Sequence, residues 1–298
     1  MNLSFQVCDE EGLSKYVQEL KEIEENILYP LENGAESFRI SHGKMYTPFF
    51  TNQGYKTRFL VIKDGQKVIG GIVAIWKNIT ISKKIHKLLY VADLKLKKGY
   101  RGKGVIKRSL SYLFIRWPFI KNFQGWDLIY FCAMQRREVG VDKTFKGMHL
   151  GRLAKPVAEL FIYMVDPKLF SDHNFSRLEY RPLKHINLSQ DREKNVLWND
   201  GIKDIVSNKN GQKIKLGHLN PEIFIKLNKK KFDDAIKEIK EKTGSLACFS
   251  IDTKEQEKLD WLKEMGLQSE TKCKIFSFSP FSFGSIKSNT FYISTGEI

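Results

Sequence analysis

Two glycines in a strongly basic stretch are the first residues in this sequence that point to a particular chemistry. Gly102 and Gly104 alternate with Arg101 and Lys103, and a helical pattern over 105–117 follows them. Glycines leave room for a ligand to approach the backbone closely, and the N–H groups at a helix N-terminus attract anions. The spacing matches neither the dinucleotide-binding Gly-x-Gly-x-x-Gly loop nor the Walker loop. The stretch therefore predicts a site for a phosphate or pyrophosphate group on a small molecule.

The positive charge of the chain is concentrated around this turn. The 298 residues include 50 Lys and Arg against 34 Asp and Glu, which gives a net charge of +16. Residues 83–108 contain ten of the basic residues and one acid, Asp93, so they carry more than half of the excess. A nucleic-acid-binding or regulatory protein is the alternative interpretation of such a charge, but no known nucleic-acid-reading motif accompanies it. The local concentration favours a phosphorylated cofactor, and we expect no nucleic acid partner.

The composition limits the class of protein further. Hydrophobic residues make up 42% of the chain and aromatic residues 12%, enough to fill a core, which excludes a mainly disordered protein. The four cysteines lie far apart, so neither a disulfide scaffold nor a Cys-based zinc module is expected, and we predict no metal. No apolar stretch approaches the roughly 18–20 residues of a membrane span. With acids at positions 9–11 arguing against a signal peptide, we expect a cytoplasmic protein.

The segments before and after the basic turn alternate between helix and strand. Apolar residues at steps of three and four predict an amphipathic helix over 13–27. The apolar stretches that predict strands are 58–62, 68–76, 88–96, 127–134 and 154–165. The strand over 88–96 leads directly into the turn, which therefore lies between a strand and a helix.

The second half of the chain has a different texture. Residues 171–215 are polar and predict a linker with irregular connections. Two helices and three strands are then predicted, at 232–242 and 255–265 and at 246–251, 274–278 and 290–294. The alternation of strands and helices predicts an α/β (α+β) fold with a mixed sheet. We place a domain boundary near residue 168, with domains over 1–168 and 169–298.

The stretch 92–106 resembles the strand–turn–helix signature of the GNAT N-acyltransferase superfamily. In that signature a polar or acidic residue in an apolar strand is followed by Arg/Gln-x-x-Gly-x-Gly/Ala; here Arg101 and Gly104 match, and Ile106 stands at the last position. The order of the predicted elements over 1–165 is similar as well. The resemblance implies a mixed central sheet flanked by helices. It also implies transfer of an acyl group from an acyl-CoA, most ordinarily acetyl-CoA, to a primary amine.

The resemblance also implies which residues hold the co-substrate. The backbone of Leu94 and Leu96 would meet the pantetheine arm of the acyl-CoA. The pyrophosphate would lie within the turn, against Arg101, Gly102, Lys103, Gly104, Val105 and Ile106. A basic rim around this turn would also suit an acidic acyl carrier protein as the donor.

Catalysis in this family needs a general base for the amine and an acid for the departing thiolate. Asp93 is the only acid in the signature strand and is the first candidate base, with Glu138 as the alternative. The family often has a tyrosine as the acid, but the nearest aromatic here is Phe145, which cannot donate a proton, so Tyr130 and His149 are the candidates. A protein that binds CoA without turnover is the alternative that these departures leave open.

Residues 261–267 resemble the ending of the family's fourth helix, yet nothing in 168–250 resembles its cofactor turn. This implies a tandem arrangement in which a second, smaller and degenerate GNAT-like unit shapes the acceptor site. In some two-lobed relatives the chain end reaches the active site, and the polar residues 292–298 permit that here. The acceptor is expected to be a small-molecule or peptide amine.

Overall fold

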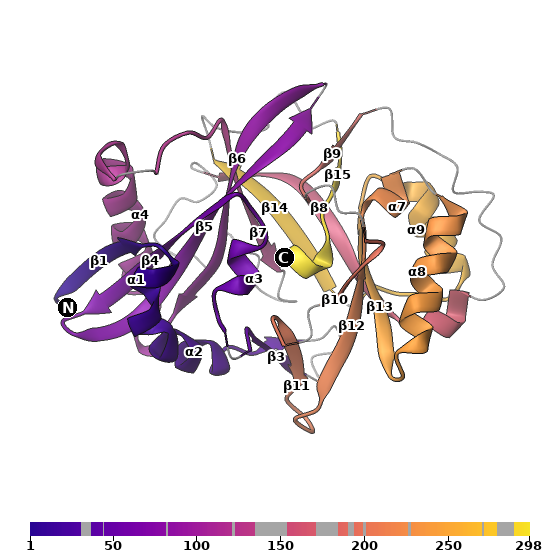
Figure 1. Cartoon of the computed structure of the whole chain (residues 1–298), viewed down its shortest axis with the longest axis horizontal. Helices are drawn as coiled ribbons and strands as arrows, with labels where there is room; N and C mark the ends of the chain where they lie inside the picture. The colour runs from indigo at the N-terminus through magenta and orange to yellow at the C-terminus, as the bar shows by residue number, and fades with distance from the viewer. Residues whose placement is uncertain are drawn as a thin grey trace.

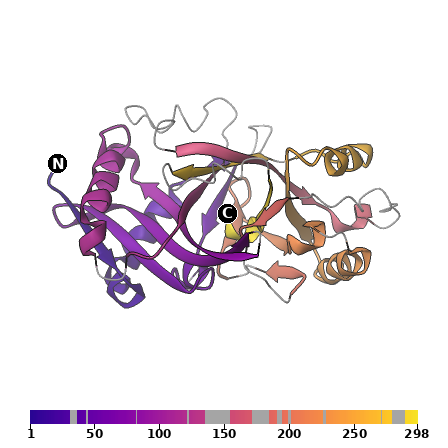
Figure 2. The same cartoon turned by 90° about the horizontal axis from the view of Figure 1, so that it is seen from above.

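A long mixed β-sheet runs through both halves of the protein and carries helices on both faces (Figure 1). This computed structural model describes residues 1–30, 37–43, 45–81, 83–120, 123–134, 154–170, 184–189, 194–198, 201–225, 228–269, 271–278 and 289–298. Figure 2 shows α2 and α4 on opposite faces near one end of the sheet, and α8 and α9 on opposite faces near the other. The predicted α/β class with a mixed sheet is confirmed.

The N-terminal strands form an antiparallel meander. Its strands are β1 (Leu3–Cys8), β4 (Lys56–Asp64), β5 (Lys67–Ile81) and β6 (Lys84–Leu96). Gly65, with a φ of 61°, turns β4 into β5, as the predicted hairpin requires. The predicted helix over 13–27 is divided into α1 (Glu10–Leu13), η1 (Ser14–Tyr16) and α2 (Val17–Glu25). The short helix α3 (Pro48–Thr51) packs on β4 and β5.

The basic turn lies in a parallel crossover. After β6 come η2 (Lys98–Tyr100), α4 (Val105–Arg116) and η3 (Trp117–Phe119), and β7 (Leu128–Met134) then returns parallel to β6. The α-helix ends ahead of Pro118, because proline lacks the N–H that a further helical turn requires. Parallel neighbours need such a crossover, so the turn lies where the first strand of the pair ends.

Strands from the two halves of the chain exchange places in the sheet. The late strand β14 (Thr271–Phe278) lies between β7 and β8 (Ala154–Val165) and is antiparallel to both. At the other edge, the early strands β2 (Tyr29–Pro30) and β3 (Ser37–Ser41) follow β11 (Asp204–Ser207). Strands from 1–168 and from 169–298 therefore share one sheet.

The second half contains another parallel pair. β12 (Lys213–Leu219) runs parallel to β13 (Ser245–Asp252), with α7 (Glu222–Ile225) and α8 (Lys229–Glu241) between them in the chain. The remaining elements are β9 (His185–Asn187), β10 (Val196–Trp198), α9 (Gln256–Glu264), β15 (Thr290–Tyr292) and the 3-10 helices η4 (Pro167–Phe170) and η7 (Thr295–Glu297). The short strands β9, β10 and β11 lie within the predicted polar linker. The sequence did not predict them, because three or four residues are too few to show an alternating pattern. No helix in the described part of the chain is long and apolar enough to cross a membrane.

The last residues of the chain are buried against both halves. The carboxylate of Glu297 accepts from Lys77 Nζ on β5 at 2.9 Å, and neither side chain is exposed to solvent (0%). The hydroxyl of Tyr90 on β6 donates to the carbonyl oxygen of Glu297 at 3.0 Å, and Ser250 Oγ on β13 donates to that of Ile293 at 2.8 Å. The final segment therefore joins the first meander to the second parallel pair.

We predict that Lys77→Met destabilises the protein by about 3–5 kcal/mol, because it removes the cation from a buried ion pair. Urea unfolding followed by circular dichroism measures this. The control is Lys67→Met, at the exposed start of the same strand, which is expected to change the free energy of unfolding by less than about 0.5 kcal/mol. Equal, small effects of both substitutions would show that the buried pair does not hold the segment.

Candidate functional site

The pairing between β6 and β7 is short. It comprises only Leu88 with Leu128, Leu89 with Ile129, and Tyr90 with Tyr130. Beyond these positions β6 continues to Leu96 paired with β5 alone, and β7 continues paired with β14. Among the described residues, no strand occupies the edge that each of these two strands turns toward the other. Main-chain groups on such edges can hydrogen-bond a ligand.

Two tyrosines stack where the strands part. The rings of Tyr90 and Tyr130 are 4.6 Å apart and nearly parallel, and both are buried. The hydroxyl of Tyr130 has no hydrogen-bond partner in the described part of the chain. Burial raises the pKa of Tyr130 well above its usual value, so the hydroxyl keeps its proton. Tyr130, the candidate acid, therefore lies where the two strands part and carries its proton.

A β-bulge in β6 places Asp93. Gly71 pairs with Lys95 and Val73 with Ala92, so that Asp93 and Leu94 both lie opposite Ile72. Asp93 has a φ of 50°, in the left-handed region. Within the bulged segment Asp93 forms an ion pair with Lys95 Nζ at 2.9 Å.

The glycine turn is held to the ends of two strands. Arg101 Nε donates to the carbonyl oxygen of Leu96 at 3.1 Å, and the Tyr100 hydroxyl donates to Asp64 on β4 at 3.1 Å. Gly102 and Gly104 have φ values of 75° and 72°, and Gly104 is the N-cap of α4. Residues 101–104 of the turn are exposed, including the side chains of Arg101 and Lys103. Leu96 before the turn and Val105 after it are buried. The turn thus presents basic side chains and the N-terminus of a twelve-residue helix to solvent, as an anion site requires.

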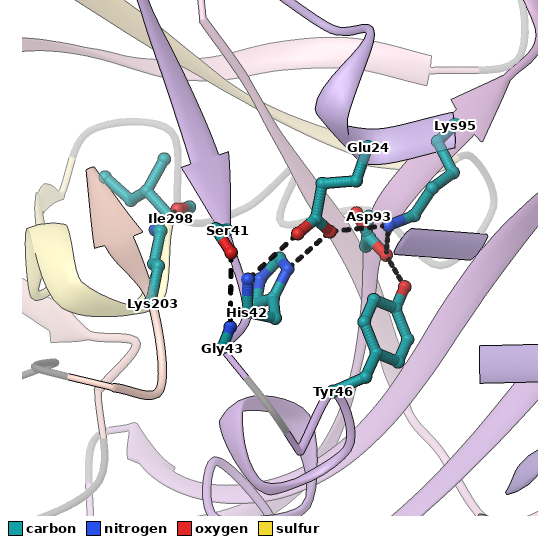
Figure 3. A network of polar contacts seen from close by, with 9 residues as sticks. All are labelled: Glu24, Ser41, His42, Gly43, Tyr46, Asp93, Lys95, Lys203 and Ile298. Carbon is teal, nitrogen blue, oxygen red and sulfur yellow. Dashed lines mark hydrogen bonds and ion pairs between the residues drawn. The ribbon is translucent and has the colours of Figure 1, made fainter. Parts of the chain in front are cut away.

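Asp93 is partly exposed and belongs to a network of five titratable side chains whose other four members are buried. We call it the Asp93 network: Glu24, His42, Tyr46, Asp93 and Lys95 (Figure 3). Lys95 Nζ bridges the two carboxylates, at 2.8 Å from Glu24 and 2.9 Å from Asp93. Glu24 also accepts from the backbone N–H of His42 at 2.9 Å and contacts His42 Nδ1 at 2.6 Å. The hydroxyl of Tyr46 donates to Asp93.

The charges in this network are set by its own members. Burial alone would raise the pKa of Glu24, but the hydrogen bond from His42 and the charge of Lys95 outweigh it and lower that pKa to about 2. Burial and the neighbouring Asp93 raise the pKa of Tyr46 well above its usual value. Glu24 is therefore ionised and Tyr46 protonated across the neutral range, with Lys95 shared between two acids.

Lys203 is a further buried cation beside this network. Its Nζ donates to the carbonyl oxygen of Ile298 and lies 4.9 Å from the centre of the Phe49 ring, and that ring packs on His42 at 4.7 Å. Loss of solvation on burial lowers the pKa of Lys203 to about 8. The C-terminal segment thus reaches the neighbourhood of the Asp93 network, as the sequence permitted.

The structure brings some of the predicted residues together. Asp93, Leu94, Leu96 and the turn residues 101–106 lie on one continuous strand–turn–helix segment, and Tyr130 lies on the strand that parts from it. Leu94 is exposed and Leu96 is buried. Glu138, Phe145 and His149 lie outside the described residues.

Four members of the Asp93 network were not predicted: Glu24, His42, Tyr46 and Lys95. They carry no motif, because the contact between Glu24 and Lys95 joins residues 71 positions apart in the sequence. A lysine following the acid by two positions in an apolar strand was the only local signal. The described residues contain no group of His, Cys, Asp and Glu side chains that could hold a metal ion.

The parted parallel strands, the bulge and the glycine turn all lie in one mixed α/β sheet flanked by helices. No protein-family model and no curated protein matches the sequence. Three structures of Saccharomyces cerevisiae N-myristoyltransferase with bound myristoyl-CoA, one also with inhibitors, are similar at 12% identity and TM-scores of 0.52, 0.52 and 0.53. The alignments cover 93%, 97% and 93% of this chain and 82%, 84% and 80% of theirs. N-myristoyltransferase itself has a GNAT fold, so the likeness extends that fold over both halves of this chain.

We predict that Gly104→Ala lowers the free energy of unfolding by about 1–2 kcal/mol, because an L-residue is strained at its φ of 72°. Space is not the cause, since nothing lies within 4 Å of the added carbon. Gly99→Ala is the matched control: its site is equally open, and its φ is outside the positive region, so stability is expected to stay or rise by up to about 1 kcal/mol. Equal effects in chemical unfolding would contradict a strained turn at Gly104.

Proposed function

We propose that this protein is an acyl-CoA-dependent N-acyltransferase that transfers an acyl group to a primary amine. The observation that carries the proposal is the parting of β6 and β7 beyond Tyr90 and Tyr130, with β6 leading into the basic glycine turn. A thioester substrate with a polar arm and a charged end matches these two features. The arm would lie along the open edge of β6, and the charged end would lie at the glycine turn that follows it. The bound myristoyl-CoA in the structures of similar fold supports an acyl-CoA as the donor.

In this proposal the pantetheine arm hydrogen-bonds to the edge of β6 near Leu94 and Leu96. The pyrophosphate lies at the turn, where the N–H groups of Val105 and Ile106 begin α4 and Arg101 and Lys103 supply positive charge. The thioester, at the other end of the arm, then lies close to Tyr90 and Tyr130. This arrangement uses the cofactor residues expected from the sequence.

The reaction forms a bond between the amine nitrogen and the acyl carbon and breaks the bond from that carbon to sulfur. Asp93 is the proposed base that takes the amine proton, and Tyr130 the proposed acid that protonates the CoA thiolate. Lys95 contacts both Asp93 and Glu24, so its ammonium group can stay paired with Glu24 while Asp93 holds a proton. The other members of the network thus keep Asp93 in place through the transfer.

We also propose a particular donor and class of acceptor for the reaction. The stacked, buried tyrosines fill the place where the strands part, which suits a short acyl group, and we propose acetyl-CoA rather than an acidic acyl carrier protein as the donor. The pair β12 and β13, with α8 between them, repeats the arrangement of β6, α4 and β7. We therefore propose that residues 169–298 are a degenerate second GNAT-like unit that shapes the acceptor site. The proposed acceptor is a small-molecule or peptide amine, and the proposed location of the protein is the cytoplasm.

Isothermal titration with CoA tests donor binding. We expect the wild type to bind and Arg101→Ala to weaken binding about tenfold or more, since a charge-assisted hydrogen bond contributes about 1.5–3 kcal/mol. Arg116→Ala, at the other end of the same helix, is the control and is expected to leave CoA binding unchanged. Absence of binding at millimolar CoA would remove the proposed function.

We further predict that Asp93→Asn lowers the turnover rate by about 100-fold or more, because the amide cannot accept the amine proton. CoA binding is expected to persist, since the amide oxygen still accepts from Tyr46. Release of CoA thiol from acetyl-CoA, measured with amino acids, polyamines and short peptides as acceptors, reports turnover. Full activity in this variant would disprove Asp93 as the base, and CoA binding without turnover on any amine would favour a pseudoenzyme.

A further inference from the structure

The helix α4 has an inner and an outer face of different character. Its inner face is buried on the sheet through Val105 and Ser109, and the Tyr112 ring packs on Phe5 of β1 at 5.2 Å. The outer side of the segment carries large apolar side chains: Phe114, Ile115 and, in η3, Phe119 are 46%, 70% and 82% exposed. Figures 1 and 2 both place α4 at the outside of the molecule.

These three exposed apolar side chains lie within six consecutive residues of the chain. The other exposed large hydrophobic residues of the described chain are separated from one another by at least nine positions in sequence: Met1, Leu28, Met45, Tyr55, Ile85, Leu94 and Leu169. Single exposed apolar residues are ordinary, whereas a group of them marks an interaction surface. The segment 114–119 is therefore the strongest candidate for one.

The charged residues of this part of the sequence have a single sign. No Asp or Glu occurs between Asp93 and Asp127, a stretch that contains nine Lys and Arg residues. On α4 itself Lys107, Arg108 and Arg116 are all exposed. A protein partner with an ordinary mixed surface would gain little from such a face, but a surface with many negative groups above an apolar layer matches both of its properties.

We propose that α4 and η3 dock on an anionic lipid surface, with Phe114, Ile115 and Phe119 inserted at the level of the acyl chains and Lys107, Arg108 and Arg116 at the headgroups. Aromatic and aliphatic side chains next to lysine and arginine are the composition of helices that lie in a membrane interface. Basic residues near the surface add attraction to anionic lipids. The proposal does not depend on acyl transfer, because it uses none of the proposed catalytic residues.

Co-sedimentation with vesicles tests the docking. The wild type is expected to bind vesicles of phosphatidylcholine with phosphatidylserine, to bind pure phosphatidylcholine more weakly, and to lose binding as salt screens the charges. The triple variant F114S/I115S/F119S is expected to bind about tenfold or more weakly, because burial of even one such side chain is worth about a factor of ten. The matched control is L28S/L169S, which removes exposed apolar residues elsewhere and is expected to bind as the wild type does.

Three outcomes would overturn the proposal. Wild-type protein that does not bind the anionic vesicles would do so, and so would a triple variant that binds as well as the control. A wild-type dimer in sedimentation velocity that the triple variant abolishes, without vesicle binding, would assign the face to a second copy of the chain. Circular dichroism and CoA titration of the triple variant, both expected to be unchanged, separate this test from folding and from the proposed acyl transfer.

Discussion

The architecture of this protein depends on a parallel strand pair that stays together for three residues and then parts. The crossover through α4 makes β6 and β7 neighbours, and the bulge at Asp93 turns β6 soon after its last pair with β7 at Tyr90. The other edge of β7 is taken by β14, from far along the chain. In the part of the chain that the structure describes, two strand edges are thereby left unpaired within the sheet, where a closed ladder would leave no main-chain groups for a ligand.

Buried charges are the second feature that this arrangement requires. The pair of Lys77 with Glu297 and the bridge of Lys95 between two carboxylates each remove ionised groups from water, which costs free energy unless the partners are well placed. Apolar side chains in these places would pack without that cost. The charges instead tie segments that are distant in sequence to β5 and β6, the strands that border the opening, and so hold its geometry from both ends of the chain.

The sequence predicted the local part of the site and missed the part that depends on tertiary structure. Strand, glycine turn and helix over 88–117 are consecutive, so periodicity and glycine spacing were sufficient, and Asp93 stood out as one acid among lysines. Glu24 on α2 joins His42, which follows β3, to Lys95 on β6, and no local pattern in the sequence records these contacts between distant segments. The position of β14 was equally out of reach, since the order of strands in a sheet is set by contacts between distant segments.

The charged residues of β6 and of the turn before α4 lie in two different environments. The basic residues of the turn, Arg101 and Lys103, are exposed, where strongly hydrated phosphates can stay in contact with water. Glu24, His42, Tyr46 and Lys95 of the Asp93 network are buried, and low polarity in the interior strengthens their charge-assisted hydrogen bonds. A group bound at the turn and extending along the edge of β6 would pass from the first environment into the second. Binding of an anion and transfer of a proton would then occur in the surroundings that suit each of them, a few residues apart on one strand.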